Sequence, residues 1–284
     1  YMTEKEPPQS IQEKYRLLSR SCCGGSVHVF NIQNRRTEQQ WVLRVFEKQR
    51  YEQRYIQDCL TVYRAAQKIQ NPCFQQVAEI EENEEYLFVV LEYLPGVTLS
   101  SLVQREGPRK PESTIALVKQ LLGLLQELRR YSPPAVFRVL EPEDIICTED
   151  GKIKLFNSGN ATVADYNHSD YTCLLLAAPG FQAPEEYAGL KAVDERTDIF
   201  HIGMIFFYMA TGIDPRQYPY YTGTDTDYLR KFLPPSYPKR TVKIISRCTT
   251  PNPAARYQSY EELESALEKL ERRLKFKNIF NRKM

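Results

Sequence analysis

The sequence lacks the patterns that mark metal centres and membrane spans. It has 3 histidines, 1 tryptophan and 12 glycines in 284 residues, and its 7 cysteines form no C-x-x-C pair. This pattern argues against a zinc site and favours reduced thiols in an intracellular protein. Because no run of about 18 apolar residues occurs, nothing in the sequence predicts a membrane-spanning helix.

The sequence also lacks an excess of either positive or negative charge. The chain has 38 Lys+Arg against 36 Asp+Glu, a formal net charge of +2, so we expect no nucleic-acid partner. Hydrophobic residues make up 42% of the chain and charged residues 26%, which is typical of a folded globular protein. The polar opening residues do not resemble a secretory signal, and we expect a cytoplasmic protein or the cytoplasmic portion of a membrane protein.

The order of predicted elements indicates an α+β fold. Strand-like runs come first and surround one helical stretch at 52–68, and the runs lie at 27–30, 41–46, 74–80 and 85–92. After Pro95-Gly96 the spacing of apolar residues predicts helices at 112–131, 199–211 and 260–274. We therefore expect a flexible lead-in, a β-rich lobe, a helical lobe and a basic tail, at residues 1–10, 11–94, 95–270 and 271–284.

Five segments carry a specific family pattern. They are Phe137–Ile145, Lys154–Gly159, Pro179–Glu185, Asp194–Gly203 and Asn252–Arg256. In this order they resemble the catalytic loop, the strand before D-F-G, the A-P-E end of the activation segment, the central helix and the arginine segment of protein kinases. The resemblance, of the bacterial Ser/Thr kinase type, implies a bilobal kinase-like fold.

The resemblance also implies that the catalytic positions are degenerate. Val139 stands where the family has its catalytic aspartate, and valine cannot accept or orient a proton. Glu141 replaces the lysine that steadies the transferred phosphoryl group, and the two metal-binding positions hold Asp144 and Asn157 in exchanged order. We therefore predict a catalytically inactive pseudokinase, not an enzyme. The alternative for Asp144 and Asn157 is a loop-capping pair rather than a weak metal site.

A residual nucleotide site is the remaining possibility for binding chemistry. Arg44 replaces the strand lysine that holds phosphates, and the helix glutamate that should pair with it falls near Val62. Arg44 could instead be bonded to a nearby acid. We expect no cofactor, with ATP or a divalent metal as the alternative, and the residues that would form the nucleotide site are Gly25, Val27, Val42, Arg44, Leu91 and Ile146.

Three residues of the resemblance are structural. Glu185 and Arg256 are expected to form an ion pair, and Asp198 is expected to hold the catalytic loop. We predict a protein-binding scaffold or regulator in bacterial signalling, whose partner is an active kinase or a phosphopeptide-binding domain. The alternative is a nucleotide sensor, or a weak phosphoryl- or nucleotidyl-transferase that uses Arg44 and Asp144.

The end of the chain is basic. Residues 272–283 hold basic side chains with Phe276, Ile279 and Phe280 between them. This pattern is typical of a solvated helix end, and the alternative is a segment that lies on an anionic membrane surface.

Overall fold

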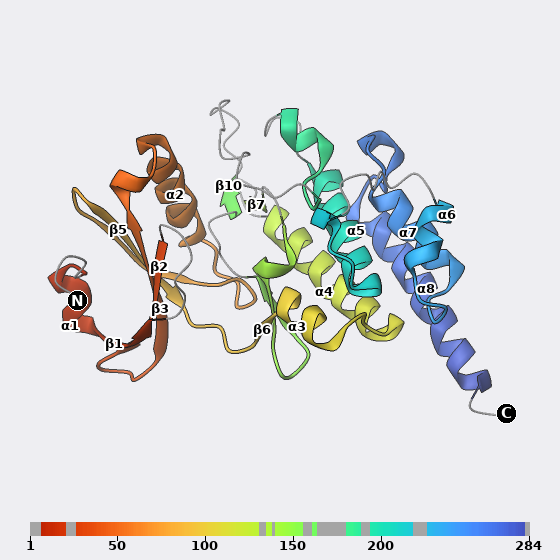
Figure 1. Ribbon diagram of the computed structural model, residues 1–284, viewed down its shortest axis with the longest axis horizontal. Helices are drawn as coiled ribbons and strands as arrows, with labels where there is room; N and C mark the ends of the chain where they lie inside the picture. Colours follow the sequence, from red (N-terminus) through yellow and green to blue (C-terminus); the bar gives the residue numbers. More distant parts are fainter. Residues whose placement is uncertain are drawn as a thin grey trace. The chain divides into compact units, whose positions relative to one another are not determined.

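The computed structural model describes residues 7–20, 27–130, 135–137, 140–155, 161–163, 180–188, 194–217 and 226–281. The chain forms two compact units. The first runs from Tyr1 to Pro95 and takes in Lys154–Val163, and the second contains Gly96–Ile153 and Ala164–Met284. The first unit is built on an antiparallel sheet and the second mainly on helices, which confirms the predicted α+β class (Figure 1).

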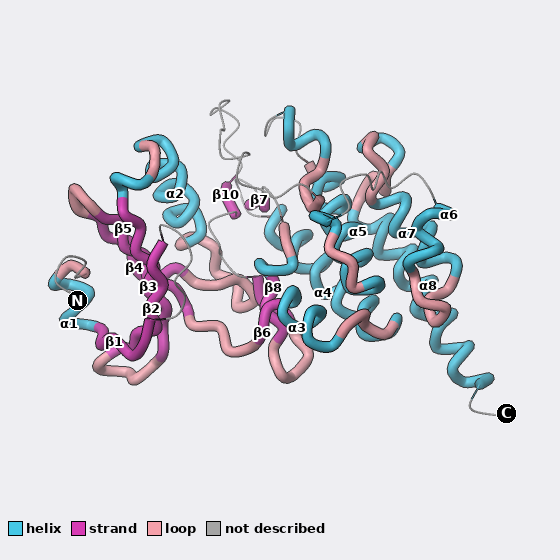
Figure 2. Tube along the Cα trace, in the orientation of Figure 1, coloured by secondary structure: helices cyan, strands magenta, loops and turns pink. Residues whose placement is uncertain are grey.

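The first unit is centred on a five-stranded antiparallel sheet of order β1-β2-β3-β5-β4 (Figure 2). Val, Ile, Leu and aromatic residues dominate its inner strands, as expected for a sheet covered by other elements. The strand bounds are β1 Tyr15–Arg20, β2 Val27–Asn34, β3 Gln40–Glu47, β4 Val77–Glu82 and β5 Tyr86–Glu92.

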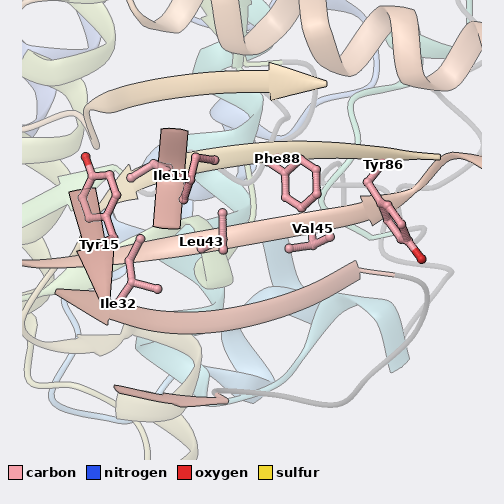
Figure 3. Close-up of a cluster of buried hydrophobic side chains, with 8 residues drawn as sticks. Ile11, Tyr15, Ile32, Leu43, Val45, Tyr86 and Phe88 are labelled. Atoms are coloured by element: carbon pink, nitrogen blue, oxygen red, sulfur yellow. The ribbon is translucent and has the colours of Figure 1, made fainter. Parts of the chain in front are cut away.

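Each face of this sheet has its own core, because successive side chains of a strand point to opposite faces. One face holds a buried cluster that includes Leu43 and Val45 of β3 and Phe88 of β5 (Figure 3). The short helix α1 (Gln9–Lys14) adds Ile11 to this cluster. On the opposite face, helix α2 (Gln53–Ala66) packs the buried ring of Tyr63 edge-on against Phe46, with centroids 6.2 Å apart.

A segment distant in sequence completes the first unit. Strand β9 (Ile153–Leu155) brings the backbone of Leu155 to Cys73 and Gln75, with N···O distances of 2.7 and 2.9 Å. Strand β10 (Ala161–Val163) then lies against α2. The 3-10 turn η1 (Lys48–Arg50) connects β3 to the start of α2.

The second unit is built around helix α5 (Glu195–Thr211), which is buried from Thr197 to its end. Its N-terminus is capped by Asp194, whose side chain accepts a hydrogen bond from the Arg196 amide at 2.8 Å. Helices α4, α7 and α8 pack against it. The helix bounds of this unit are α3 Leu99–Glu106, α4 Pro111–Arg129, α6 Thr226–Phe232, α7 Lys239–Cys248 and α8 Tyr260–Asn281.

Two glycines allow close backbone approaches in the second unit. A Cβ atom on Gly203 of α5 would lie 2.5 Å from the Cβ of Cys248 on α7, so glycine lets the two helices meet. Gly96 has a φ of +143°, and a Cβ there would lie 2.5 Å from the carbonyl oxygen of Cys147. Gly96 leads into β6 (Val97–Thr98), which pairs antiparallel with β8 (Ile145–Cys147).

In the described part of the chain, the remaining short elements are β7 (Ala135–Phe137) and four 3-10 turns, η2 Pro142–Asp144, η4 Pro184–Ala188, η6 Pro215–Gln217 and η7 Pro253–Ala255. Helix α8 continues to Asn281, so the predicted basic tail is helical up to that residue. Within the described ranges, no helix has the length and apolar character needed to cross a bilayer.

Candidate functional site: a loop of acids and its anchors

The segment that resembles the catalytic loop is closed on itself by Glu141 and Asp144. The two residues form a reciprocal capping box around the turn η2. The Glu141 amide donates to Asp144 Oδ2 at 3.0 Å, and the Asp144 amide bonds the Glu141 carbonyl oxygen at 2.9 Å. Asp144 is 2% exposed, so its carboxylate is held by the backbone of its own turn.

The charge around Glu141 is mainly negative. Burial, together with the nearby carboxylates of Asp144 and Glu143, raises the pKa of Glu141 to about 7. Arg216 opposes this rise, and its Nη1 lies 4.0 Å from Glu141 Oε1. With a pKa near 7, Glu141 can take up or release a proton at neutral pH, which is a property that acid–base chemistry requires.

Arg216 was missed by the sequence analysis and is the main cation of this loop. Its Nη2 contacts Glu143 Oε1 at 2.9 Å and Asp214 Oδ2 at 2.8 Å. Its guanidinium lies over the Phe181 ring, 5.4 Å from the centroid. Gly180 leaves room for the Arg216 backbone, since a Cβ on Gly180 would lie 2.6 Å from the Arg216 nitrogen. The sequence signal that could have indicated this ion pair is the i, i+2 spacing of Asp214 and Arg216.

Arg44 lies in the middle of β3, opposite Val29 of β2 and Val89 of β5. Its Nη1 donates to the hydroxyl of Tyr63 at 2.8 Å. Tyr63 follows Val62, the position expected for the pairing glutamate, so a neutral hydroxyl holds Arg44 at that point of α2. Burial raises the pKa of Tyr63, which therefore remains neutral beside the guanidinium.

The other predicted nucleotide residues are divided between the two units. Val42 and Leu91 are direct cross-strand partners in the β3–β5 pair, and Val27 begins β2. Ile146 lies in β8 of the second unit and is 7% exposed. Gly25, Val139 and Asn157 lie outside the described residues. Among the described residues no group of three or more His, Cys, Asp or Glu side chains is arranged to hold a metal ion.

Arg256 and Glu185 meet in the second unit. Arg256 is fully buried, and its two terminal nitrogens donate to the two Glu185 oxygens at 2.6 and 2.8 Å. The other donors bond backbone carbonyl oxygens, so all five N–H groups of Arg256 are used, and these oxygens belong to Thr250, Arg196 and Pro251. Burial alone would raise the pKa of Glu185, but Arg256 and Thr197 outweigh it and hold the pKa below its ordinary value.

Asp198 is bound by two side chains that sequence reasoning did not identify. Its Oδ2 accepts from Arg129 Nε of α4 at 2.9 Å and from the hydroxyl of Tyr260 of α8. Asp198 is 2% exposed and thereby joins α4, α5 and α8. Asp198 was expected to hold the catalytic loop at 137–145, of which residues 138 and 139 lie outside the described residues.

A second buried acid lies next to Glu185. Glu186 and His201 are both fully buried, and His201 Nε2 lies 2.9 Å from Glu186 Oε2. The same oxygen accepts from the Ala183 amide at 2.6 Å. Burial would lower the pKa of His201, but the Glu186 carboxylate reverses the shift and raises it. The Arg256–Glu185 pair thus joins the arginine segment to the A-P-E segment, and the Glu186–His201 pair fixes the A-P-E segment to α5.

Comparison with known proteins identifies the family. The protein kinase domain model matches residues 21–267. The serine/threonine-protein kinase PrkC of Bacillus subtilis is 24% identical over 207 residues, which are 71% of this chain and 32% of that protein. PknL of Mycobacterium tuberculosis is 24% identical over 268 residues, 89% of this chain and 65% of that protein. The serine/threonine-protein kinase pkn3 of Myxococcus xanthus is 25% identical over 289 residues, which are 95% of this chain and 52% of that protein.

The chain therefore spans between about a third and two thirds of the length of these relatives. All three are named serine/threonine-protein kinases, which contradicts the prediction that the chain is not an enzyme. That prediction was wrong because it judged the chemistry from single substituted positions, two of which, Val139 and Asn157, lie outside the described residues. The match over residues 21–267 confirms the resemblance found in the sequence, and the chain belongs to the protein kinase domain family.

Proposed function

We propose that this chain acts in bacterial signalling as a regulator that binds a protein partner through its kinase-type domain. The observation that supports this proposal best is the buried anchor of the second unit, in which Arg256 uses all five donors of its guanidinium to bind Glu185 and nearby backbone carbonyl oxygens. Such an anchor gives a rigid helical surface, and rigid surfaces lose little entropy on binding. An active Ser/Thr kinase of the same bacterium is the partner that we propose.

This regulatory role is tested by adding the purified chain to each Ser/Thr kinase domain encoded by the same genome. The initial rate of phosphoryl transfer to a general protein substrate is measured as the concentration of the chain rises. We expect at least one kinase to change its rate twofold or more, with saturation, and to co-elute with the chain. Absence of both effects for every kinase would overturn the proposal.

A second candidate is phosphoryl transfer that depends on Arg44 and Asp144. It is supported by the family match and by the cation that Tyr63 fixes in the centre of β3, which suits a phosphate group. The residues that would bind ATP and a divalent metal are Arg44 and Asp144, respectively.

Thermal unfolding with ATP or ADP, in Mg²⁺, Mn²⁺ or EDTA, tests this second candidate. A ligand at about 100 times its Kd adds roughly 2.7 kcal/mol of stability, a shift of several degrees. We expect a metal-dependent shift that Arg44→Ala abolishes. Asp144→Asn keeps an acceptor for the capping turn and should remove the metal dependence alone. A shift that survives both substitutions would exclude these residues as the site.

A further inference from the structure

A groove between α7 and α8 carries a strong excess of positive charge. It has a volume of about 660 Å³ and lies wholly within the second unit, where the two helices are neighbours (Figure 1). Its walls hold one acidic side chain, Glu262, and six basic side chains, which are Lys239, Arg240, Lys243, Arg247, Lys269 and Arg273. This excess is local, since the whole chain has a net charge of only +2.

The single acid of the groove is already neutralised. Arg247 Nη2 lies 2.6 Å from Glu262 Oε1, and the Arg247 guanidinium stacks on the Tyr257 ring at 4.2 Å from its centroid. The other five cations make no ion pair with a carboxylate in the part of the chain that the structure describes. Five positive charges along one groove therefore have no ion-pair partner among the described residues.

Two acids of helix α8 lie away from the groove. Its acids at 261 and 271 point toward α4, where Glu261 bonds Gln126 at 2.8 Å and Glu271 pairs with Lys119 at 3.0 Å. The groove face instead presents Lys269 and Arg273 at i, i+4 spacing. The positive charge of the groove is thus a feature of one helix face and not of the helix as a whole.

Helix α7 carries positive charge at its N-terminal end, where positive charge destabilises a helix. Lys239 and Arg240 occupy the first turn, which contains no acid, although the helix dipole favours negative charge there. Cations at this end oppose the helix dipole and lower the stability of the helix. A bound anion would offset that cost and the mutual repulsion of the groove cations.

The length of the groove along α8 matches a short extended peptide. The lining of α8 spans Glu262 to Arg273, which at a rise of about 1.5 Å per residue is roughly 16 Å. An extended chain of about five residues has the same length, and about three of its side chains face one wall. Three carboxylates would bring three negative charges, whereas three phosphates bring about five, which matches the excess of the groove.

We infer that this groove binds a phosphorylated segment of a protein partner, with two or three phosphoserine or phosphothreonine side chains against Lys243, Lys269 and their basic neighbours. The inference rests on the proposed function, because it names the chemistry by which a partner is recognised. Ile244 and Ala266 supply an apolar floor for the peptide backbone and its uncharged side chains.

The test measures fluorescence anisotropy with the full chain in 0.15 M salt and labelled nine-residue peptides. One peptide carries three phosphoserines at alternating positions, a second has serine and a third has glutamate there. We expect the phosphorylated peptide to bind at least tenfold more tightly than either of the others. Lys243→Glu with Lys269→Glu should weaken it at least tenfold, because both lysines are exposed and reversing them removes most of the net positive charge of the lining.

The matched control is Lys110→Glu with Lys231→Glu, which changes the same net charge at exposed lysines that do not line the groove. It should alter the phosphopeptide Kd less than twofold. Equal weakening by both pairs, or no binding of the phosphopeptide, would overturn the inference. So would binding to vesicles with 30% phosphatidylserine that depends on the groove while the phosphopeptide does not bind. The groove variant is also tested for its effect on the rate of a partner kinase. If that effect equals the effect of the unchanged chain, the proposed function stands and this inference is refuted.

Discussion

Glu185 and Glu141 are two glutamates of the same helical unit with opposite surroundings. Glu185 faces a guanidinium whose five donors are all used, and its pKa is lowered. Glu141 lies among other carboxylates, and its pKa is raised to about 7. The comparison shows that the unit neutralises the charges that hold its helices together and tolerates repulsion in the loop at 141–144. Three substitutions test it, from the largest expected effect to the smallest.

Arg256→Met should have the largest effect. It leaves the Glu185 carboxylate buried without its partner, and breaking such a pair costs about 3–5 kcal/mol. Urea unfolding of the chain at pH 8 measures the loss.

The double variant Arg256→Met with Glu185→Gln is the control for this loss. It removes the uncompensated charge and should regain part of the stability. Because the pKa of Glu185 is lowered, its contribution is present above the unfolded value and disappears as the pH falls through the folded value. A loss of under 1 kcal/mol for the single variant would show that the anchor is not what stabilises the unit.

Arg216→Met should be less costly, since the side chain keeps 24% of its surface exposed. It removes the cation between Glu143 and Asp214, and we expect a loss of about 2 kcal/mol at pH 8. The loss should be smaller at pH 5, where Glu141 is protonated. Urea unfolding at the two pH values measures both effects.

Arg105→Met is the matched control, because that arginine is 62% exposed and pairs with Glu106 at the surface. It should change the stability by no more than about 0.5 kcal/mol. Equal effects of the two substitutions would mean that the acidic loop does not depend on Arg216.

Glu141→Gln should have the smallest effect and the opposite sign. The amide oxygen can still cap the turn, but the charge is gone. In the natural chain the raised pKa gives stability that is full below about 4.5 and is lost as the pH rises through about 7. The variant should therefore be more stable than the natural chain at pH 8, by about 1–2 kcal/mol since Glu141 keeps 19% of its side chain exposed, and equally stable near pH 4.5.

Thermal unfolding at these two pH values measures the gain, with the exposed Glu149→Gln as control. If Glu141→Gln were destabilising at pH 8, the ionised carboxylate would be contributing to the fold, and the comparison with Glu185 would fail.

The fold could be predicted because its signals are local. Strand-like runs at 41–46 and 85–92 predicted β3 and β5, and the helical spacing at 112–131 predicted α4. The pair of Glu185 and Arg256, 71 residues apart, could be predicted because each residue belongs to a short sequence motif of the family. The prediction failed on catalysis because it converted residue identities into chemistry without the family-wide match.

The remaining contacts could not be found from spacing. Tyr260 and Arg129 reach Asp198 from helices that are distant in sequence, and neither residue belongs to a motif that we used. The groove likewise depends on two helix faces that become neighbours only after folding. Long-range polar pairs are decided by packing geometry, which hydrophobic periodicity does not encode.

The return of Lys154–Val163 to the first unit has a consequence for synthesis on the ribosome. The sheet β1–β5 is complete in sequence by residue 92, yet the backbone partners of Cys73 and Gln75 are translated only at Leu155. At about 5–20 residues per second, β10 follows the sheet by roughly 4–14 s. During that interval the backbone groups of Cys73 and Gln75 lack these partners, so the first unit is completed only after part of the second unit has been translated.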